Sequence, residues 1–179
     1  MIAYAITDPS TLNFHNLESD IKRFAYKATM IVYRDKSTLN YMQNAEKFIH
    51  EAQKHSFSKI LLHSDYSLAH RLKADGVHLT STQFDAIEEA KTLGLFVIVS
   101  THSLEEALKA QKNGADMITF SPLFLTPNKG EPKGIKELNR VASNLFIPLI
   151  ALGGIVSEKQ LLLCKQSKAE GFASIRWFA

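Results

Sequence analysis

Residues 147–155 read Ile-Pro-Leu-Ile-Ala-Leu-Gly-Gly-Ile, an apolar run that ends in two glycines. A continuous apolar run of this length is typical of a strand in a parallel sheet that is covered on both faces. Paired glycines after such a strand let a ligand approach the backbone, and the free N–H groups at the start of the next helix favour an anion. The stretch therefore predicts a parallel α/β fold with an anion site at the carboxyl ends of its strands.

Seven further apolar runs occur along the chain, and segments with helical periodicity separate them. The eight runs are Ile2–Ile6, Thr29–Tyr33, Lys59–Leu62, Gly76–Leu79, Leu95–Val99, Asp116–Phe120, Phe146–Ala151 and Gly171–Ile175. Such an alternation is typical of a parallel sheet whose strands are joined by helices.

Two of the intervening segments show the helical pattern clearly. In the first, apolar residues recur at steps of three and four, which predicts an amphipathic helix with one buried stripe. Its stripe comprises Leu39, Met42, Ala45, Phe48, Ile49 and Ala52, and its polar side comprises Glu46, Lys47, Glu51 and Lys54. In the second, Ser103 and Glu106 predict a capped start and Asn113-Gly114 predicts the end of the helix.

Eight such units could form an open doubly wound sheet or a closed barrel. A dinucleotide-binding open sheet carries its phosphate site in a Gly-rich turn after the first strand, but here that turn reads Thr7-Asp8-Pro9-Ser10. Polar residues instead follow several of the runs, as expected for the mouth of a barrel. We therefore predict an α/β fold, a TIM (βα)8 barrel, formed by residues 1–179 as a single domain.

Only Arg176-Trp177-Phe178-Ala179 follows the last run, which is too short for a helix. The prediction is a short form of the barrel that lacks the eighth helix, with the outer face of the last and first strands partly uncovered. Exposed apolar surface of this kind is usually covered by another subunit or by a rearranged segment. We therefore expect a homo-oligomer, most simply a dimer.

Composition excludes several classes of protein. Hydrophobic residues make up 45% and charged residues 22% of the chain, which is ordinary for a globular protein. There is no apolar run of about 18 residues and no signal peptide, so we expect a cytoplasmic protein without a membrane partner. The net charge of +3 comes without a basic block, which argues against nucleic acid and is compatible with a small anion. The single cysteine, Cys164, excludes an internal disulfide and is expected to pack on a helix face.

Residues directly after the runs are nearly all polar or glycine. They are Arg34, Asp35, Lys36, His63, Ser64, Asp65, Thr80, Ser81, Ser100, Thr101, His102, Ser121, Gly153, Gly154 and Arg176. Arginine and lysine at such positions suit phosphate, although a solvated charge run is the alternative interpretation. The long loop 121–130 adds Lys129, which could close over an anion unless the loop is only a flexible surface segment. No histidine spacing supports a transition-metal site, and His78 is expected to be hydrogen-bonded inside the barrel.

Taken in order, these segments resemble the thiamin-phosphate synthase/TenI family of barrels. The matching stretches are Tyr4–Asp8, Val32–Lys36, Ala74–Leu79, Val99–Ser103, Gly114–Asp116, Ser121–Lys129 and Ile147–Ile155. The resemblance implies an enzyme that joins hydroxymethylpyrimidine diphosphate to thiazole phosphate with the help of Mg²⁺ and releases pyrophosphate. It implies no organic cofactor. Carried over by position, it puts the diphosphate near Arg34, Lys36, Ser100, Thr126, Asn128 and Lys129, and the thiazole phosphate near Gly153, Gly154 and Arg176.

The chain departs from the family pattern at the metal. The two family aspartates that hold Mg²⁺ correspond to Ser64 and Gln83. Asp65 and Asp85 lie close in sequence, but a shift of one residue at a strand end turns a side chain to the opposite face. The resemblance therefore implies no metal ligand at the aligned positions, and whether Mg²⁺ binds stays open.

Three functions stay open. The first is an enzyme of the thiamin pathway, either a synthase with altered metal use or a TenI-like thiazole tautomerase. In TenI-like relatives a histidine after strand six acts as acid or base, and this chain has Pro122 there, so His63 and His102 are the candidates for that role. The second is a protein that binds thiazole phosphate or thiamin phosphate without turnover. The third is an unrelated phosphate-ester enzyme on the same barrel.

Overall fold

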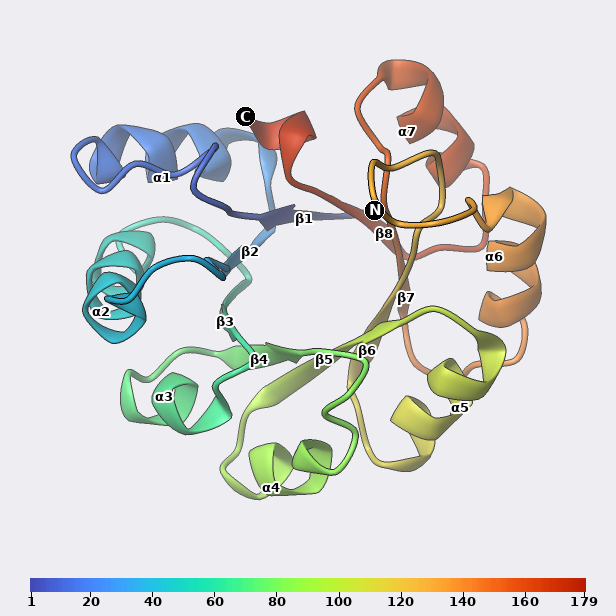
Figure 1. Ribbon diagram of the computed structural model, residues 1–179, viewed down its shortest axis with the longest axis horizontal. Helices are drawn as coiled ribbons and strands as arrows, with labels where there is room; N and C mark the ends of the chain where they lie inside the picture. The colour runs from blue at the N-terminus through green and yellow to red at the C-terminus, as the bar shows by residue number, and fades with distance from the viewer.

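The computed structural model describes residues 1–179 and consists of eight parallel strands closed into a barrel in sequence order (Figure 1). The strands are β1 (Ile2–Ile6), β2 (Met30–Tyr33), β3 (Lys59–His63), β4 (Gly76–Leu79), β5 (Phe96–Thr101), β6 (Met117–Phe120), β7 (Leu149–Leu152) and β8 (Gly171–Ser174). The helices are α1 (Leu17–Lys27), α2 (Tyr41–Ala52), α3 (Tyr66–Arg71), α4 (Ala86–Thr92), α5 (Leu104–Lys112), α6 (Gly134–Ala142) and α7 (Glu158–Lys165), followed by a 3₁₀ turn, η1 (Arg176–Phe178). The barrel predicted from the sequence is confirmed.

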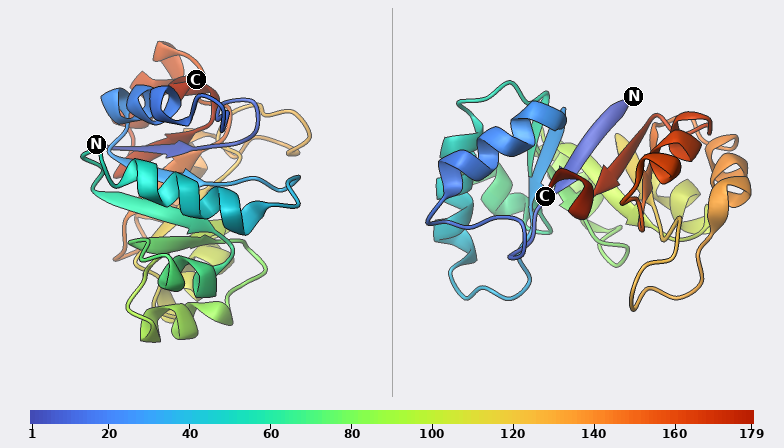
Figure 2. Two further views of the ribbon diagram at one scale, coloured as in Figure 1. Left: turned by 90° about the vertical axis from the view of Figure 1, so that its left-hand side faces the viewer. Right: turned by 90° about the horizontal axis from the view of Figure 1, so that it is seen from above.

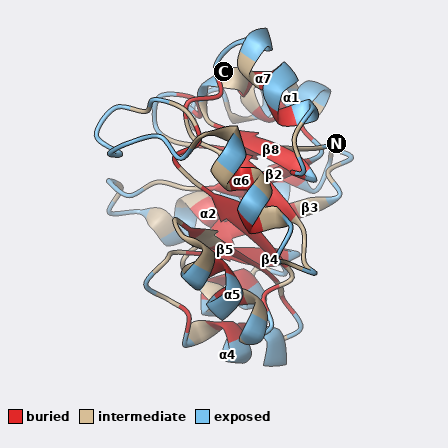
Figure 3. Cartoon of the chain, turned by 90° about the vertical axis from the view of Figure 1, so that its right-hand side faces the viewer, coloured by how far each residue is buried: buried red, intermediate tan, exposed pale blue.

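Two hydrophobic cores result because successive side chains on a strand point to opposite faces. The larger core lies between the outer face of the barrel and the helices, and Figure 3 shows the buried strands behind helices whose outer faces are exposed. The smaller core fills the barrel and comprises Tyr4, Ile6, Met30, Val32, Leu61, Ile98, Met117, Ile150 and Ala173. Arg34, His63 and Ser100 each follow one of these filling residues by two positions, at the carboxyl ends of β2, β3 and β5. The same alternation therefore turns their side chains inward.

The predicted elements differ from the observed ones mainly at their ends. Strand β7 begins at Leu149, whereas the apolar run predicted a start at Phe146. Proline has no N–H to donate to a ladder, and the backbone N–H groups of Phe146 and Ile147 donate to the Gln111 side chain, 2.7 and 3.3 Å away. Phe146 thus lies outside the strand, and its side chain is 97% exposed.

Helix α2 begins at Tyr41, so the prediction that Leu39 and Met42 lie on its buried stripe is wrong. Leu39 precedes the helix and is fully exposed, and Met42 is also exposed. Glu51, expected on the polar side, is buried and pairs with Lys54 at 2.7 Å. Helix α5 follows the prediction, since the Ser103 hydroxyl accepts from the backbone N–H of Glu106 and Gly114 ends the helix with a φ of 95°.

The expectation that the outer face of β8 is uncovered is wrong. Phe172 on β8 is buried because it stacks on Phe178 of η1 at 5.7 Å between ring centroids, with Trp177 edge-on at 6.3 Å. Arg23 of α1 donates to the carbonyl of Phe178 at 2.6 Å and fixes the turn, which lies between α1 and α7 in Figure 1. This removes the reason for which an oligomer was expected, and the oligomer stays a prediction.

The expectation for the cysteine is confirmed. Cys164 is buried on α7 and is a free thiol. None of the helices has the length and apolarity that crossing a membrane requires.

Candidate functional site at the barrel mouth

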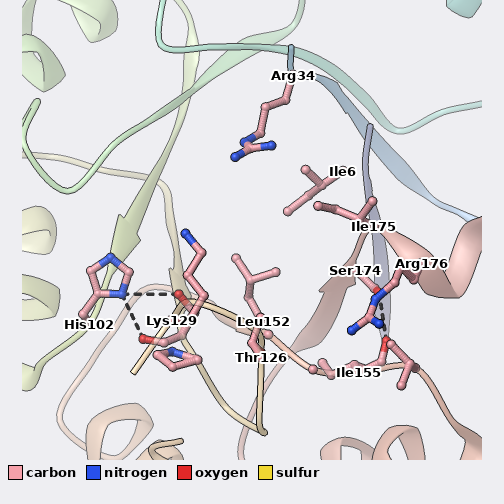
Figure 4. Close-up of a pocket in the computed structure, with 15 residues that line it drawn as sticks. Ile6, Arg34, His102, Thr126, Lys129, Leu152, Ile155, Ser174, Ile175 and Arg176 are labelled. Carbon is pink, nitrogen blue, oxygen red and sulfur yellow. Dashed lines mark hydrogen bonds between the residues drawn. The ribbon is translucent and has the colours of Figure 1, made fainter. Parts of the chain in front are cut away.

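A cavity of about 230 Å³ opens at the carboxyl ends of the strands (Figure 4). Figure 2 shows the loop between β6 and α6 protruding at this end of the barrel. The cavity is lined by Ile6, Arg34, His102, Ser121, Pro122, Thr126, Lys129, Leu152, Gly153, Gly154, Ile155, Val156, Ser174, Ile175 and Arg176. Residues from the ends of β1, β2, β5, β6, β7 and β8 thus share one space, as the barrel fold dictates.

Cations gather at one end of this cavity. Arg34 follows β2 and Lys129 lies in the loop after β6, and Figure 4 shows their side chains extending from different sides into the same space. The charge of Arg34, then burial, then the charge of Lys129 lower the pKa of the Lys36 ammonium group, so Lys36 lies within the electrostatic reach of both. Three cations that repel one another in this way create a positive potential suited to an anion.

The neighbouring histidines are uncharged at neutral pH. Burial, then Arg34 and Lys36, lower the pKa of His63 to about 4. Burial, then His63 and Arg34, lower the pKa of His78 to about 3. Their ring centroids lie 6.1 Å apart beside the cationic end, and neither imidazole adds charge there. Both ring nitrogens of His78 have partners inside the barrel, and Nδ1 of His63 lies 2.9 Å from the Ser64 hydroxyl, so only Nε2 of His63 is without a partner in the chain.

The turn Gly153-Gly154 forms the other end of the cavity. Both residues have positive φ angles, 102° and 71°. A Cβ on Gly153 would lie 2.9 Å from Cα of Pro122, and one on Gly154 would lie 2.7 Å from the carbonyl of Leu125. The loop after β6 packs on this turn and leaves no room for a Cβ at either position. Glycine is therefore required here whether or not a ligand binds.

The same turn presents unused donors. The backbone N–H groups of Gly153, Gly154 and Ile155 donate to no acceptor in the chain, whereas the N–H of Val156 donates to the Gln160 side chain at 2.9 Å. The Ser174 hydroxyl of β8 donates to the carbonyl of Ile155 at 2.8 Å and holds the turn against the last strand. Unpaired N–H groups just before a helix are a suitable site for a phosphate.

His102 lies at the cavity beside the loop after β6. Its Nδ1 is 2.9 Å from the carbonyl of Ser121 and 3.3 Å from the Ser121 hydroxyl. A carbonyl only accepts hydrogen bonds, so Nδ1 carries a proton, and in the neutral form of the ring Nε2 is the nitrogen with the free lone pair. His102 and Pro122 both line the cavity, while His63 lies outside its lining.

The residues at the aligned metal positions do not fit Mg²⁺. The Gln83 amide donates to the carbonyl of Ser64 at 3.0 Å and accepts from the backbone N–H of Thr80 at 3.0 Å. Asp65 is used as the N-cap of α3, where it accepts from Leu68 at 2.8 Å, and Asp85 is exposed at the start of α4. Magnesium prefers carboxylate oxygens, and no group of three acidic, histidine or cysteine side chains converges anywhere in the chain. The hydrogen bond from Gln83 to Ser64 joins the loops after β3 and β4 without charge.

The structure brings together most of the predicted site residues. Arg34, Thr126, Lys129, Gly153, Gly154, Arg176 and His102 line the cavity. Lys36, Ser100, Asn128 and His63 do not, and Asn128 is exposed with a φ of 60°. The apolar lining from Ile6, Leu152 and Ile175 was not predicted, although the in/out alternation of each strand could have indicated it.

Comparisons with known proteins agree with this architecture. A family model described as thiamine monophosphate synthase matches residues 3–178. A protein of Aquifex aeolicus named "Putative thiamine-phosphate synthase 2" is 34% identical over 98% of this chain and 96% of its own length. The thiamine-phosphate synthase of Clostridium acetobutylicum is 30% identical over 87% of this chain and 76% of its own.

A solved structure of thiamine phosphate pyrophosphorylase from Pyrococcus furiosus superimposes with a TM-score of 0.83 at 26% identity, covering 97% of this chain and 85% of that one. The family model spans nearly the whole chain, and the relatives align over most of their own lengths. The chain belongs to the thiamine monophosphate synthase family.

Proposed function

We propose that the protein acts in thiamin biosynthesis by binding two phosphorylated precursors in the cavity at the barrel mouth and joining them, with release of pyrophosphate. The observation that carries this proposal is one cavity with two separate anion-attracting ends. The diphosphate of the hydroxymethylpyrimidine precursor binds near Arg34, Lys36 and Lys129. The thiazole phosphate binds the open N–H groups of the Gly153-Gly154 turn, with Arg176 beside it.

The proposed reaction exchanges one bond for another. The thiazole ring nitrogen forms a bond to the methylene carbon of the pyrimidine, the bond from that carbon to the diphosphate oxygen breaks, and pyrophosphate leaves with the electron pair. The leaving group gains negative charge in the transition state, and preorganised cations at that position lower the barrier. Arg34, Lys36 and Lys129 supply this charge, and no step is assigned to a metal.

One observation favours a second candidate, a thiazole tautomerase. This reaction moves a proton between two positions of the thiazole phosphate ring and requires an acid or base at the cavity. His102 lines the cavity, and the contacts of its Nδ1 with Ser121 leave Nε2 without a partner in the chain. Proton transfer by a positioned imidazole is common near neutral pH.

Pyrophosphate release separates these functions. The purified protein is incubated with both precursors, in Mg²⁺ or in a chelator, and binding of each precursor is measured by calorimetry. Release that survives the chelator is the expected result. Release only in Mg²⁺ would contradict the metal-independent step, and binding of thiazole phosphate without release would overturn the coupling reaction.

If coupling is overturned, conversion of the thiazole isomer followed by NMR tests the tautomerase, and His102→Gln should abolish that conversion. A matched control is Lys47→Ala, which removes an exposed charge on α2 far from the cavity and should change neither reaction.

A further inference from the structure

A chain of three side chains runs up the inside of the barrel to its mouth. The Tyr4 hydroxyl on β1 lies 2.9 Å from Nδ1 of His78 on β4, and Nε2 of His78 lies 3.0 Å from the Ser100 hydroxyl on β5. Tyr4 and His78 are buried, and their rings stack at 5.7 Å between centroids. Only Ser100, at the upper end of the chain, is partly exposed.

The direction of these hydrogen bonds follows from the number of available protons. The Tyr4 hydroxyl has no other partner, so it avoids a buried, unsatisfied O–H only by donating to Nδ1 of His78. Burial and nearby cations keep His78 neutral, with a pKa of about 3, so the ring has one N–H. That proton therefore sits on Nε2 and is donated to the oxygen of Ser100.

The consequence concerns the serine proton. A serine hydroxyl whose oxygen already accepts from Nε2 has its own O–H free for another acceptor. With the opposite tautomer of His78, the hydroxyl would donate inward to Nε2 and would present only lone pairs to the mouth. Lone pairs repel an anion, so the tautomer decides whether Ser100 helps or hinders anion binding.

We infer that Tyr4 and His78 are positioning residues that orient the Ser100 hydroxyl to donate to an anionic oxygen at the barrel mouth. This inference rests on the proposed function for one point only, that the diphosphate lies at the cationic end near Ser100. It assigns a role to two buried polar side chains inside an otherwise apolar barrel filling.

The direct test is the protonation of the His78 ring, observed by NMR of the ¹⁵N-labelled protein at neutral pH. We expect a protonated Nε2 and an unprotonated Nδ1. In Tyr4→Phe, which removes the donor to Nδ1, we expect a population of the opposite tautomer. A proton on Nδ1 in the unmodified protein would overturn the inference, whatever ligands bind.

The functional test uses inorganic pyrophosphate as the probe, with affinity measured by calorimetry. A hydrogen bond to a charged group contributes about 1.5–3 kcal/mol, so Ser100→Ala should weaken binding at least about tenfold. Tyr4→Phe should weaken it several-fold, with no further loss when combined with Ser100→Ala. Equal effects of Tyr4→Phe with and without Ser100 would contradict the orienting role and would indicate a purely structural one.

The matched control is Tyr33→Phe, which also removes a buried phenol hydroxyl. Unlike the hydroxyl of Tyr4, that of Tyr33 has no hydrogen-bond partner in the chain. It should alter neither the His78 tautomer nor pyrophosphate binding. If the unmodified protein binds no pyrophosphate, the proposed diphosphate site is wrong, while the ring spectra still decide the orientation of Ser100.

Discussion

At the scale of single residues, Ser64 and Gln83 are uncharged, whereas a magnesium site usually has carboxylates. The Gln83 amide donates to the backbone carbonyl of Ser64, so an uncharged contact joins the loops after β3 and β4. The sequence, through its resemblance to the family, indicated that Ser64 and Gln83 stand where metal aspartates are expected. It could not show that Gln83 reaches across to Ser64, because the two lie on different loops. It also could not show whether Asp65 compensates, and its use as a helix cap shows that it does not.

Placing carboxylates at positions 64 and 83 should create a metal site. Ser64 has a φ of 67°, a conformation that aspartate tolerates, so Ser64→Asp with Gln83→Asp is compatible with the backbone. We expect the double variant to bind Mn²⁺, a probe for Mg²⁺, in a titration followed by electron paramagnetic resonance. Ser64→Asn with Gln83→Asn is the neutral control, and equal Mn²⁺ binding by the unmodified chain would contradict this interpretation.

The two buried histidines predict how stability depends on pH. Their pKa values in the folded protein, about 4 for His63 and about 3 for His78, lie below the ordinary value of 6.5. The unfolded chain therefore binds more protons as the pH falls below 6.5, and the free energy of unfolding decreases. Each histidine contributes at most about 1.4 kcal/mol per pH unit in this window.

Urea unfolding at pH 7.5 and pH 5 measures this effect. His63→Gln should reduce the loss of stability between the two pH values, whereas His50→Gln, an exposed position on α2, should leave it unchanged. An undiminished loss in His63→Gln would show that this imidazole is already charged in the folded protein.

At the scale of elements, the Gly153-Gly154 turn and the loop after β6 form one unit. The backbone N–H groups of Leu123 and Phe124 donate to the carbonyls of Leu152 and Gly153, at 2.8 and 3.0 Å. The paired glycines were predictable as an anion-binding turn, but the loop that covers them was not, because contacts between β6 and β7 loops leave no local sequence pattern. The start of β7 was also not predictable from the apolar run, as the exposed Phe146 on the approach to the strand shows.

Alanine in the Gly153-Gly154 turn should therefore lower the free energy of unfolding by more than its positive φ alone explains. Gly130 also has a positive φ, 72°, but open space surrounds it. Gly130→Ala should therefore lower the free energy of unfolding by only about 1 kcal/mol. Gly153→Ala adds a collision with Pro122, and we expect a loss of about 2–4 kcal/mol in chemical unfolding. Equal losses for the two variants would show that the loop after β6 does not rest on the turn.

At the scale of the whole molecule, the barrel closes without an eighth α-helix. The eight-fold alternation of runs was sufficient to predict the closed sheet, because every run proved to be a strand in the expected order. The cover of β8 by η1 was not predictable, because a turn of three residues is too short to show a periodic apolar pattern. Aromatic stacking of Phe172 on Phe178 replaces the helix that other units have.

Phe178→Ala tests how much this cover of β8 stabilises the protein. The side chain is fully buried, and truncating a buried phenylalanine typically costs about 3–5 kcal/mol. Phe146→Ala removes an exposed ring and should change the free energy of unfolding by less than about 0.5 kcal/mol. A similarly small loss for Phe178→Ala in urea unfolding would mean that the cover of β8 by η1 contributes little to stability.

The division of the barrel mouth into two anion sites is tested most directly by Lys129→Ala. Calorimetry compares the affinity of this variant for inorganic pyrophosphate and for thiazole phosphate with that of the unmodified protein. We predict a loss of about tenfold or more for pyrophosphate, the size expected for one charge-assisted contact, and less than about twofold for thiazole phosphate. Equal losses for the two ligands would contradict the two-ended cavity.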